Sequence, residues 1–229
     1  MERYRIAVPI IGPSFREFIQ QGLLASEQGI DFLEVRLDYM NNPNVNQIML
    51  SFPRFQKIIT ARHLDEAGPD NEAGWKGSES ERISLLEKAA SDSNHPAFID
   101  IELNHFYPIN INVEKTKLIV SYHNFNETPD DSVLESIFDK AVSKNADIVK
   151  IATKAVSLED SERLLNFTER NKRHKDLIVI GMGENGRTTR IYGPAKGSYL
   201  TFACLSEENA TASGQMTVEQ LRKAWQSIG

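Results

Sequence analysis

Residues 118–151 read LIVSYHNFNETPDDSVLESIFDKAVSKNADIVKI, and this stretch decides the fold. It begins with the apolar run 118–122 and ends with a second one, 147–151. Between them, apolar residues recur at the three- and four-residue spacing of an amphipathic helix: Val133, Leu134, Ile137, Phe138, Ala141 and Val142. A strand, a helix and a strand in succession predict two parallel strands joined by a right-handed crossover.

The same alternation extends along the chain in both directions. Short apolar runs predict eight strands, at 4–10, 32–37, 57–61, 97–103, 118–122, 147–151, 177–182 and 199–205. A helical pattern or a helix-sized gap follows nearly every one, although residues 106–113 favour neither state. Eight such units favour an α/β fold with a single (β/α)8 TIM barrel, one catalytic domain over residues 1–229. An open doubly wound sheet is the alternative, and periodicity alone does not separate the two.

Composition narrows the classes of partner. The chain has 229 residues, with 26 Lys plus Arg against 32 Asp plus Glu, a net charge of −6. This acidic balance disfavours nucleic acids and anionic membranes as partners. The apolar runs are far shorter than the roughly 18 residues of a membrane-spanning helix, and the N-terminus lacks the pattern of a signal peptide, so we expect a cytoplasmic protein. The single cysteine, Cys204, is expected in the core and cannot form an internal disulfide.

Reactive side chains gather at the predicted strand ends, where barrels place their active sites. Lys150 lies between Val149 and Ile151, and alternation along a strand turns it away from both, into the barrel. Desolvation there favours the neutral amine, a nucleophile toward carbonyl groups. A lysine paired with Asp147 or Glu102 is the simpler interpretation. His123 ends the preceding strand and could serve beside Lys150 as a proton shuttle, or it could be purely structural.

Charged residues at other strand ends indicate a polar or anionic ligand. Glu34 and Arg36 share one face of a strand, as a ligand-binding pair or a structural ion pair. Arg62 and Arg190 would give an acidic protein a local basic pocket, and arginine binds carboxylates bidentately. Arg187 is expected on the surface.

Two other motifs support competing interpretations. Residues 181–186, GMGENG, match the dinucleotide pattern G-x-G-x-x-G. However, residues 187–197 contain Pro194 and further glycines and predict a poor helix, and too little chain follows for the usual fold. A second possibility is a divalent-metal site formed by Asp100, Glu102, His105 and His123, whose spacing is not diagnostic.

The ordered set of motifs resembles the type I 3-dehydroquinate dehydratases, from the first strand to about residue 215. The segments that carry the resemblance are 34–38 (EVRLD), 60–62 (TAR), Asp100 with Glu102, 121–125 (SYHNF), 149–152 (VKIA), Met182-Gly183, 186–190 (GRTTR) and 212–215 (ASGQ). Each is weak alone, and their order and spacing make the match specific.

The resemblance implies a lyase of the shikimate pathway of aromatic amino acid biosynthesis, which makes chorismate. The reaction is the syn dehydration of 3-dehydroquinate to 3-dehydroshikimate, without metal or cofactor, in a homodimer. Lys150 would form the Schiff base, His123 would transfer protons, and Glu66 would orient His123. The positions that match substrate-binding residues are Glu34, Arg36, Arg62, Arg190, Thr211 and Gln215. The positions that match the apolar pocket lining are Phe125, Met182, Phe202 and Ala212.

Two departures from the family pattern concern loops. The closing loop usually reads Ser-Ala-Pro-Gly-Gln, and here residues 211–215 read TASGQ, so Ser213 replaces a proline. The third strand is followed by Glu66-Ala67-Gly68 where many relatives have Glu-Gly-Gly. Neither change removes a catalytic group. The rival hypotheses are a metal-dependent enolising enzyme, another Schiff-base barrel enzyme such as an aldolase, a dinucleotide-binding oxidoreductase and a non-catalytic binding protein.

Overall fold

The computed structural model describes residues 4–68, 73–112 and 114–228. Strands and helices alternate, except that β5 follows β4 without a helix in the described residues between them, and every strand pairing is parallel. The strands are β1 (Ile6–Ile10), β2 (Phe32–Arg36), β3 (Gln56–Thr60), β4 (Phe98–Glu102), β5 (Lys117–Asn124), β6 (Ile148–Lys154), β7 (Asp176–Met182), β8 (Thr201–Cys204) and β9 (Met216–Thr217). The eight predicted strands are therefore confirmed, and β9 is a short addition.

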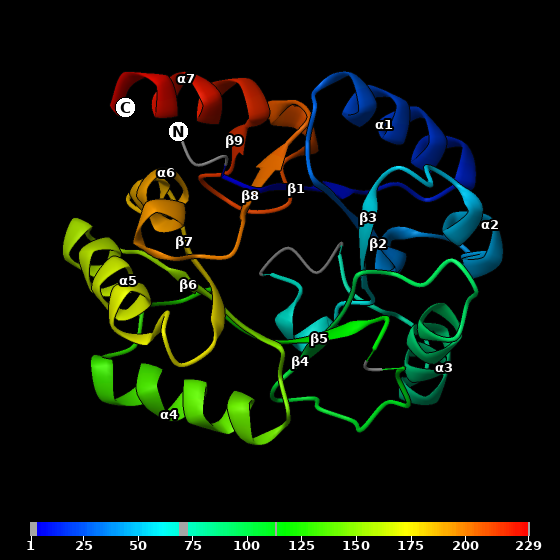
Figure 1. Ribbon diagram of the computed structural model, residues 1–229, viewed down its shortest axis with the longest axis horizontal. Coiled ribbons are helices and arrows are strands. Elements are labelled where there is room, and N and C mark those ends of the chain that lie inside the picture. The colour runs from blue at the N-terminus through cyan, green and yellow to red at the C-terminus, as the bar shows by residue number, and fades with distance from the viewer. Residues whose placement is uncertain (1–3, 69–72, 113, 229) are drawn as a thin grey trace.

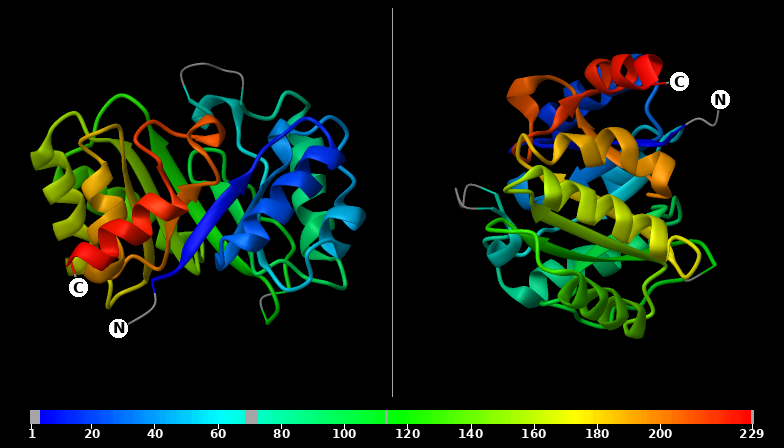
Figure 2. Two further views of the ribbon diagram at one scale, coloured as in Figure 1. Left: turned by 90° about the horizontal axis from the view of Figure 1, so that it is seen from above. Right: turned by 90° about the vertical axis from the view of Figure 1, so that its left-hand side faces the viewer.

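The helices surround the strands, as Figure 1 shows. They are α1 (Phe15–Glu27), α2 (Val45–Leu50), α3 (Glu79–Ala90), α4 (Asp131–Ser143), α5 (Leu158–Asn171), α6 (Arg187–Lys196) and α7 (Val218–Ile228), with the 3₁₀ turns η1 (Leu37–Tyr39), η2 (Leu64–Glu66) and η3 (Glu207–Asn209). In the right panel of Figure 2, α5 and α6 lie across the outside of the strands. No helix in the described part of the chain is long and apolar enough to span a membrane.

The strands close into a barrel. Neighbouring strands follow the order β7-β6-β5-β4-β3-β2-β1-β8-β9, so β1 pairs with both β2 and β8. The remaining seam, between β7 and the start of β8, is joined by a bridge from Leu177 to Ser198 and by the Tyr199 N–H, which donates to the Leu177 carbonyl at 2.6 Å. This closure confirms the (β/α)8 prediction over an open doubly wound sheet.

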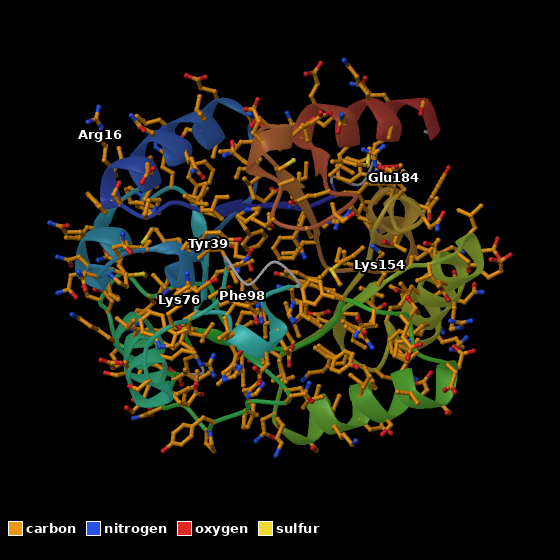
Figure 3. All side chains as sticks on the ribbon, turned by 180° about the vertical axis from the view of Figure 1, so that it is seen from behind. Arg16, Tyr39, Lys76, Phe98, Lys154 and Glu184 are labelled. Atoms are coloured by element: carbon orange, nitrogen blue, oxygen red, sulfur yellow. The ribbon has the colours of Figure 1, made fainter. Side chains whose placement is uncertain are left out.

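Two apolar cores follow from the alternation of side chains along each strand. Residues such as Leu33, Val149 and Ile151 pack outward against the helices. Inside the barrel, a separate layer fills the end opposite the pocket with residues that include Phe32, Ile58, Phe98, Ile119, Ile148 and Ile178. Figure 3 shows Phe98 within the ring of strands and Arg16 at the outer rim. Cys204 is buried, as predicted.

One segment differs from the prediction: residues 187–196 form α6 although Pro194 lies in it. Close packing of the helix start on β7 stabilises it. The Thr189 hydroxyl accepts the Gly181 N–H at 2.8 Å, and a Cβ at Gly186 would lie 2.3 Å from the Gly181 carbonyl carbon. Pro194 falls in the second half of the helix, and tertiary contacts compensate for its missing hydrogen bond.

Candidate active site

All the residues predicted for the site line one pocket at the carboxyl ends of the strands. They are Glu34, Arg36, Arg62, Glu66, His123, Phe125, Lys150, Met182, Arg190, Phe202, Thr211, Ala212 and Gln215. Ala67, Ala152 and Ile180 complete the lining.

Strand alternation explains why Lys150 faces the pocket. Its neighbours Val149 and Ile151 belong to the outer core, whereas Ile148 and Ala152 belong to the inner one. The register of β5 against β6 places Ser121 beside Lys150 and His123 beside Ala152. The two predicted catalytic side chains therefore line the same pocket from adjacent strands.

The Lys150 amine is buried and paired. Its Nζ lies 2.8 Å from Asp100 Oδ2 and 3.5 Å from Glu34 Oε1, and it sits 4.6 Å from the centre of the Phe202 ring. The suggested partners Asp147 and Glu102 were wrong. Asp147 accepts the Leu118 N–H instead. The position of the amine is thus fixed on one side by carboxylates and on the other by an aromatic face.

A buried ion-pair network surrounds this lysine. Arg62 binds Asp100 through NH2 at 3.1 Å and Glu102 through NH1 at 2.7 Å, and the Ser121 hydroxyl donates to Asp100 Oδ1 at 2.6 Å. Burial alone would raise the pKa of Asp100, but the Arg62 and Lys150 cations outweigh it and hold that pKa well below its usual value. Asp100 therefore stays ionised and accepts hydrogen bonds only.

Glu66 fixes the orientation of His123. Glu66 Oε2 lies 3.0 Å from His123 Nδ1 and also accepts the His123 backbone N–H at 3.0 Å. The amide of Asn104 donates to the other oxygen, Oε1, at 2.9 Å. Since both oxygens accept donors, the network suits an ionised Glu66 and a proton on Nδ1. Nε2 of His123 is then left as the free base.

Burial also shifts the pKa values of both members of the Glu66–His123 dyad. Burial raises the pKa of Glu66 to about 7, and the Glu102 charge adds to the rise. Burial lowers the pKa of His123 well below its ordinary value, with further lowering by the cations of Arg62 and Lys150. The two groups contact each other, so one proton added near neutral pH belongs to the pair.

Two further charged residues complete this side of the pocket. Arg36 makes a bidentate pair with Asp38, from Nε to Oδ1 at 2.9 Å and from NH2 to Oδ2 at 2.7 Å, so the suggested pairing with Glu34 was wrong. Glu34 instead accepts the Thr60 hydroxyl at 3.1 Å. Both side chains face the pocket from β2, as their spacing predicts.

The opposite side of the pocket is mostly apolar and carries one isolated cation. Met182, Phe202 and Ala212 line it around Arg190, which is 1% exposed. Arg190 NH1 donates to the Phe202 carbonyl at 3.3 Å, Nε has no hydrogen-bond partner, and no carboxylate among the described residues pairs with it. Burial lowers the pKa of Arg190 to about 10, which still leaves it charged at neutral pH.

The closing loop crosses the end of β7 by a close backbone approach. The Gly183 N–H donates to the Ser213 carbonyl at 2.8 Å, and Gly214 adopts a left-handed φ of 73°. A Cβ on Gly214 would lie 2.1 Å from the Gly183 carbonyl oxygen, so this crossing requires glycine. Thr211 and Gln215 face the pocket from the loop and are joined by the Thr211 N–H, which donates to Gln215 Oε1 at 2.7 Å.

The structure does not assemble the alternative sites. Asp100 and Glu102 are occupied by cations, and His123 by Glu66, so these residues do not form a ligand set with His105. The glycines of residues 181–186 instead permit the tight packing of α6 on β7 and the loop crossing. Arg187, expected on the surface, is half-buried: it pairs with Glu184 at 3.2 Å, and its Nε is buried without a hydrogen-bond partner.

The sequence analysis did not predict two supporting residues, Arg82 and Asn104. Arg82 of α3 is fully buried and donates to Glu102 Oε2 at 2.7 Å and to the Ala61 carbonyl at 3.0 Å. Asn104 was not considered at all. A signal for Arg82 was available, because it lies on the buried helix face that carries Leu86 and Ala89. An arginine on an apolar face predicts a buried anion.

Known proteins resemble this chain in both sequence and fold. A family model described as type I 3-dehydroquinase matches residues 6–229. The 3-dehydroquinate dehydratase of Methanococcus maripaludis strain C5 is 38% identical over 231 residues, which cover 97% of this chain and 99% of that protein. The crystal structure of 3-dehydroquinate dehydratase from Geobacillus kaustophilus superposes with a TM-score of 0.86 at 24% identity, over 99% of this chain and 91% of that one. The Aquifex aeolicus enzyme gives a TM-score of 0.76 at 28% identity, over 98% of both chains.

Proposed function

The chain belongs to the type I 3-dehydroquinase family, and from this premise we propose that it dehydrates 3-dehydroquinate to 3-dehydroshikimate through a Schiff base on Lys150. One observation carries the mechanism: the buried Lys150 shares a pocket with His123, whose Nδ1 is held by Glu66 at 3.0 Å. A fixed amine and a fixed imidazole are the two groups that an imine-assisted elimination requires.

The first step is attack of the Lys150 amine on the ring ketone. The ammonium first loses a proton, for which Glu34 Oε1, 3.5 Å from Nζ, is a nearby acceptor. The C–N bond forms, and the ketone oxygen takes one proton from the amine nitrogen and one back from Glu34 and leaves as water. The resulting iminium withdraws electrons from the adjacent carbon and makes its C–H bond acidic.

His123 then carries one proton through the elimination. Its Nε2 takes the proton from the carbon beside the iminium, and the electron pair moves to nitrogen to give an enamine. The enamine expels the β-hydroxyl group, which leaves as water with the proton that His123 returns. A second water hydrolyses the iminium and frees Lys150, so the net change is the loss of one water from the substrate. Glu66 stabilises the imidazolium between the two transfers.

The unpaired Arg190 gives the substrate its orientation. A buried guanidinium without a carboxylate partner favours an anionic ligand, and Gln215 and Thr211 adjoin it across the closing loop. We infer that Arg190 and Gln215 hold the substrate carboxylate, and that Glu34, Arg36 and Arg62 contact ring hydroxyl groups. The apolar surface of Met182 and Phe202 then covers the ring.

Borohydride trapping tests the proposal. We expect incubation with 3-dehydroquinate and borohydride to add one reduced ligand to the intact mass, and peptide mapping to place it on Lys150. Lys150→Met should lose both adduct and turnover. Lys154→Met, on the same strand, is the matched control and should keep both. Turnover without any adduct would refute the imine mechanism.

His123→Ala separates the two chemical roles. Without the imidazole, the imine should still form and be trapped, but turnover should fall by roughly 10²–10⁴-fold because proton transfer stalls. Normal turnover in this variant would remove His123 from the mechanism. The family resemblance alone supports the shikimate pathway, a single catalytic domain, a cytoplasmic location and a homodimer, the last of which light scattering measures directly.

A further inference from the structure

A compact cluster of two histidines and one aspartate lies beside the segment that carries Glu66. Asp65 Oδ2 is 3.4 Å from His105 Nε2 and 3.7 Å from His63 Nδ1, and the three ligand atoms all lie within 4.8 Å of one another. His63 immediately precedes η2, Asp65 lies within it, and His105 belongs to the loop after β4. None of the three lines the pocket described above.

We propose that His63, Asp65 and His105 form a site for a first-row transition-metal ion of the zinc class. Two imidazole nitrogens and one carboxylate oxygen are a common ligand set for Zn²⁺. Tetrahedral bonds of about 2.0–2.1 Å separate neighbouring ligand atoms by roughly 3.4 Å. The two Asp65 distances are therefore already close to those of a loaded site.

The ligand atoms are accessible, although His63 Nδ1 must give up one hydrogen bond to bind an ion. The Asp65 N–H donates to His63 Nδ1 at 3.2 Å, and a bound ion would replace this hydrogen bond. The His63 and His105 rings stack with their centres 3.4 Å apart and tilted by 10°. Stacking holds both rings at the Asp65 carboxylate, and because the two ring planes are nearly parallel, one ring must rotate out of the stack to direct its lone pair at the ion. The Asp65 side chain is 68% exposed, which leaves room for water as the fourth ligand.

The backbone on both sides of the cluster is anchored to buried charges. The His63 N–H donates to Glu102 Oε1 at 2.9 Å, and the His105 carbonyl accepts from Arg82 NH2 at 3.4 Å. Glu79 and Glu102 pair with Arg82 and offset its positive charge near the cluster. An ion bound here would cross-link the segment after β3 to the loop after β4 without entering the catalytic pocket.

Titration with zinc chloride tests the site, because the chain contains only five histidines. We expect one Zn²⁺ per chain by calorimetry, and shifts in the NMR signals of two histidine rings, those of His63 and His105. His63→Ala and His105→Ala should each weaken binding by at least about tenfold. The matched controls His95→Ala and His174→Ala should bind as the native protein does.

Three results would overturn the proposal: no measurable binding, binding that survives both ligand variants, or binding that disappears in His123→Ala. The last result would place the ion in the catalytic pocket. The NMR readout uses the unaltered protein, so a variant that fails to fold does not block the test. Binding is measured without turnover, and the outcome is therefore independent of the proposed dehydratase activity.

Discussion

The two walls of the pocket differ in whether their buried cations have carboxylate partners. On the wall built by β2 to β6, each pocket cation meets a carboxylate: Arg36 pairs with Asp38, and Arg62 and Lys150 share Asp100. On the wall built by β7, α6, β8 and the closing loop, Arg190 is equally buried, yet no described carboxylate pairs with it.

In the proposed mechanism, this difference separates the groups that react from the group that binds the substrate carboxylate. Each cation of the paired wall has its carboxylate partner before any ligand arrives, so the groups to which we assign catalysis are held in place in advance. The unpaired wall is completed only by an anion from outside. On the proposed function, a substrate that brings a carboxylate to Arg190 would thereby be directed with its reacting carbons toward Lys150 and His123.

Removing the central cation of the paired wall should produce the largest effect. Arg62→Met leaves Asp100 and Glu102 buried with less compensation, and we expect the free energy of unfolding to fall by about 3–5 kcal/mol. Urea denaturation measures the change. Arg62→Lys keeps the charge and should recover part of the loss. A stability equal to that of the native protein would show that the network is not what holds this wall together.

The same substitution on the other wall should behave differently. Arg190→Met removes a buried cation without a carboxylate partner, so stability should not fall. In contrast, kcat/KM for 3-dehydroquinate should drop roughly 10²-fold, which corresponds to a loss of about 3 kcal/mol of transition-state stabilisation. The variant Arg187→Met serves as the matched control and should change neither quantity. If Arg190→Met destabilised the protein as strongly as Arg62→Met, the contrast between the walls would be wrong.

Substitution of Glu66 tests whether this residue sets the pH at which the Glu66–His123 dyad takes up a proton. Burial raises the pKa of Glu66 to about 7, so below that pH the dyad gains a proton and kcat/KM should decline. Glutamine cannot take this proton. In Glu66→Gln only His123 titrates, and burial lowers its pKa, so the acid limb of kcat/KM should move to lower pH. The loss of a charged hydrogen bond should also reduce transition-state stabilisation by about 1.5 kcal/mol, which lowers kcat/KM roughly tenfold. If the acid limb of the kcat/KM profile stayed at the same pH in Glu66→Gln, a group other than Glu66 would be responsible for it.

The contrast between the walls also marks what the sequence could predict. Alternation around Lys150 predicts its direction correctly, because Val149 and Ile151 must face the helices. Partners across strands were less predictable. The pairing of Lys150 with Asp100 depends on the barrel register, which brings together residues 50 positions apart. The expected partners were Asp147, which is near in the chain, and Glu102, which pairs with Arg62 and Arg82 instead.

Long-range packing also explains why the secondary-structure prediction was wrong for residues 187–196. Pro194 and the nearby glycines weaken the helical propensity of residues 187–196, but contacts between Gly181, Gly186 and Thr189 stabilise α6. Asn104 follows the same rule. It lies in the loop after β4, and only the folded loop brings it to Glu66. Residues whose role depends on loop geometry leave no periodic signal in the sequence.

The smallest effect is expected at the closing loop, where Ser213 replaces the proline typical of the family. The crossing is already fixed by Gly183 and Gly214, and the Ser213 carbonyl, which proline retains, makes its hydrogen bond. Within the described residues, the Ser213 N–H donates no backbone hydrogen bond, so proline removes none of these. Ser213→Pro should therefore act mainly by restricting the open loop and stabilise the closed one by about 0.4–1 kcal/mol, seen as a modest fall in KM. Ser213→Ala lacks that restriction and should leave KM unchanged. A rise in KM for the proline variant would show that the unpaired wall needs a mobile loop to admit its anion.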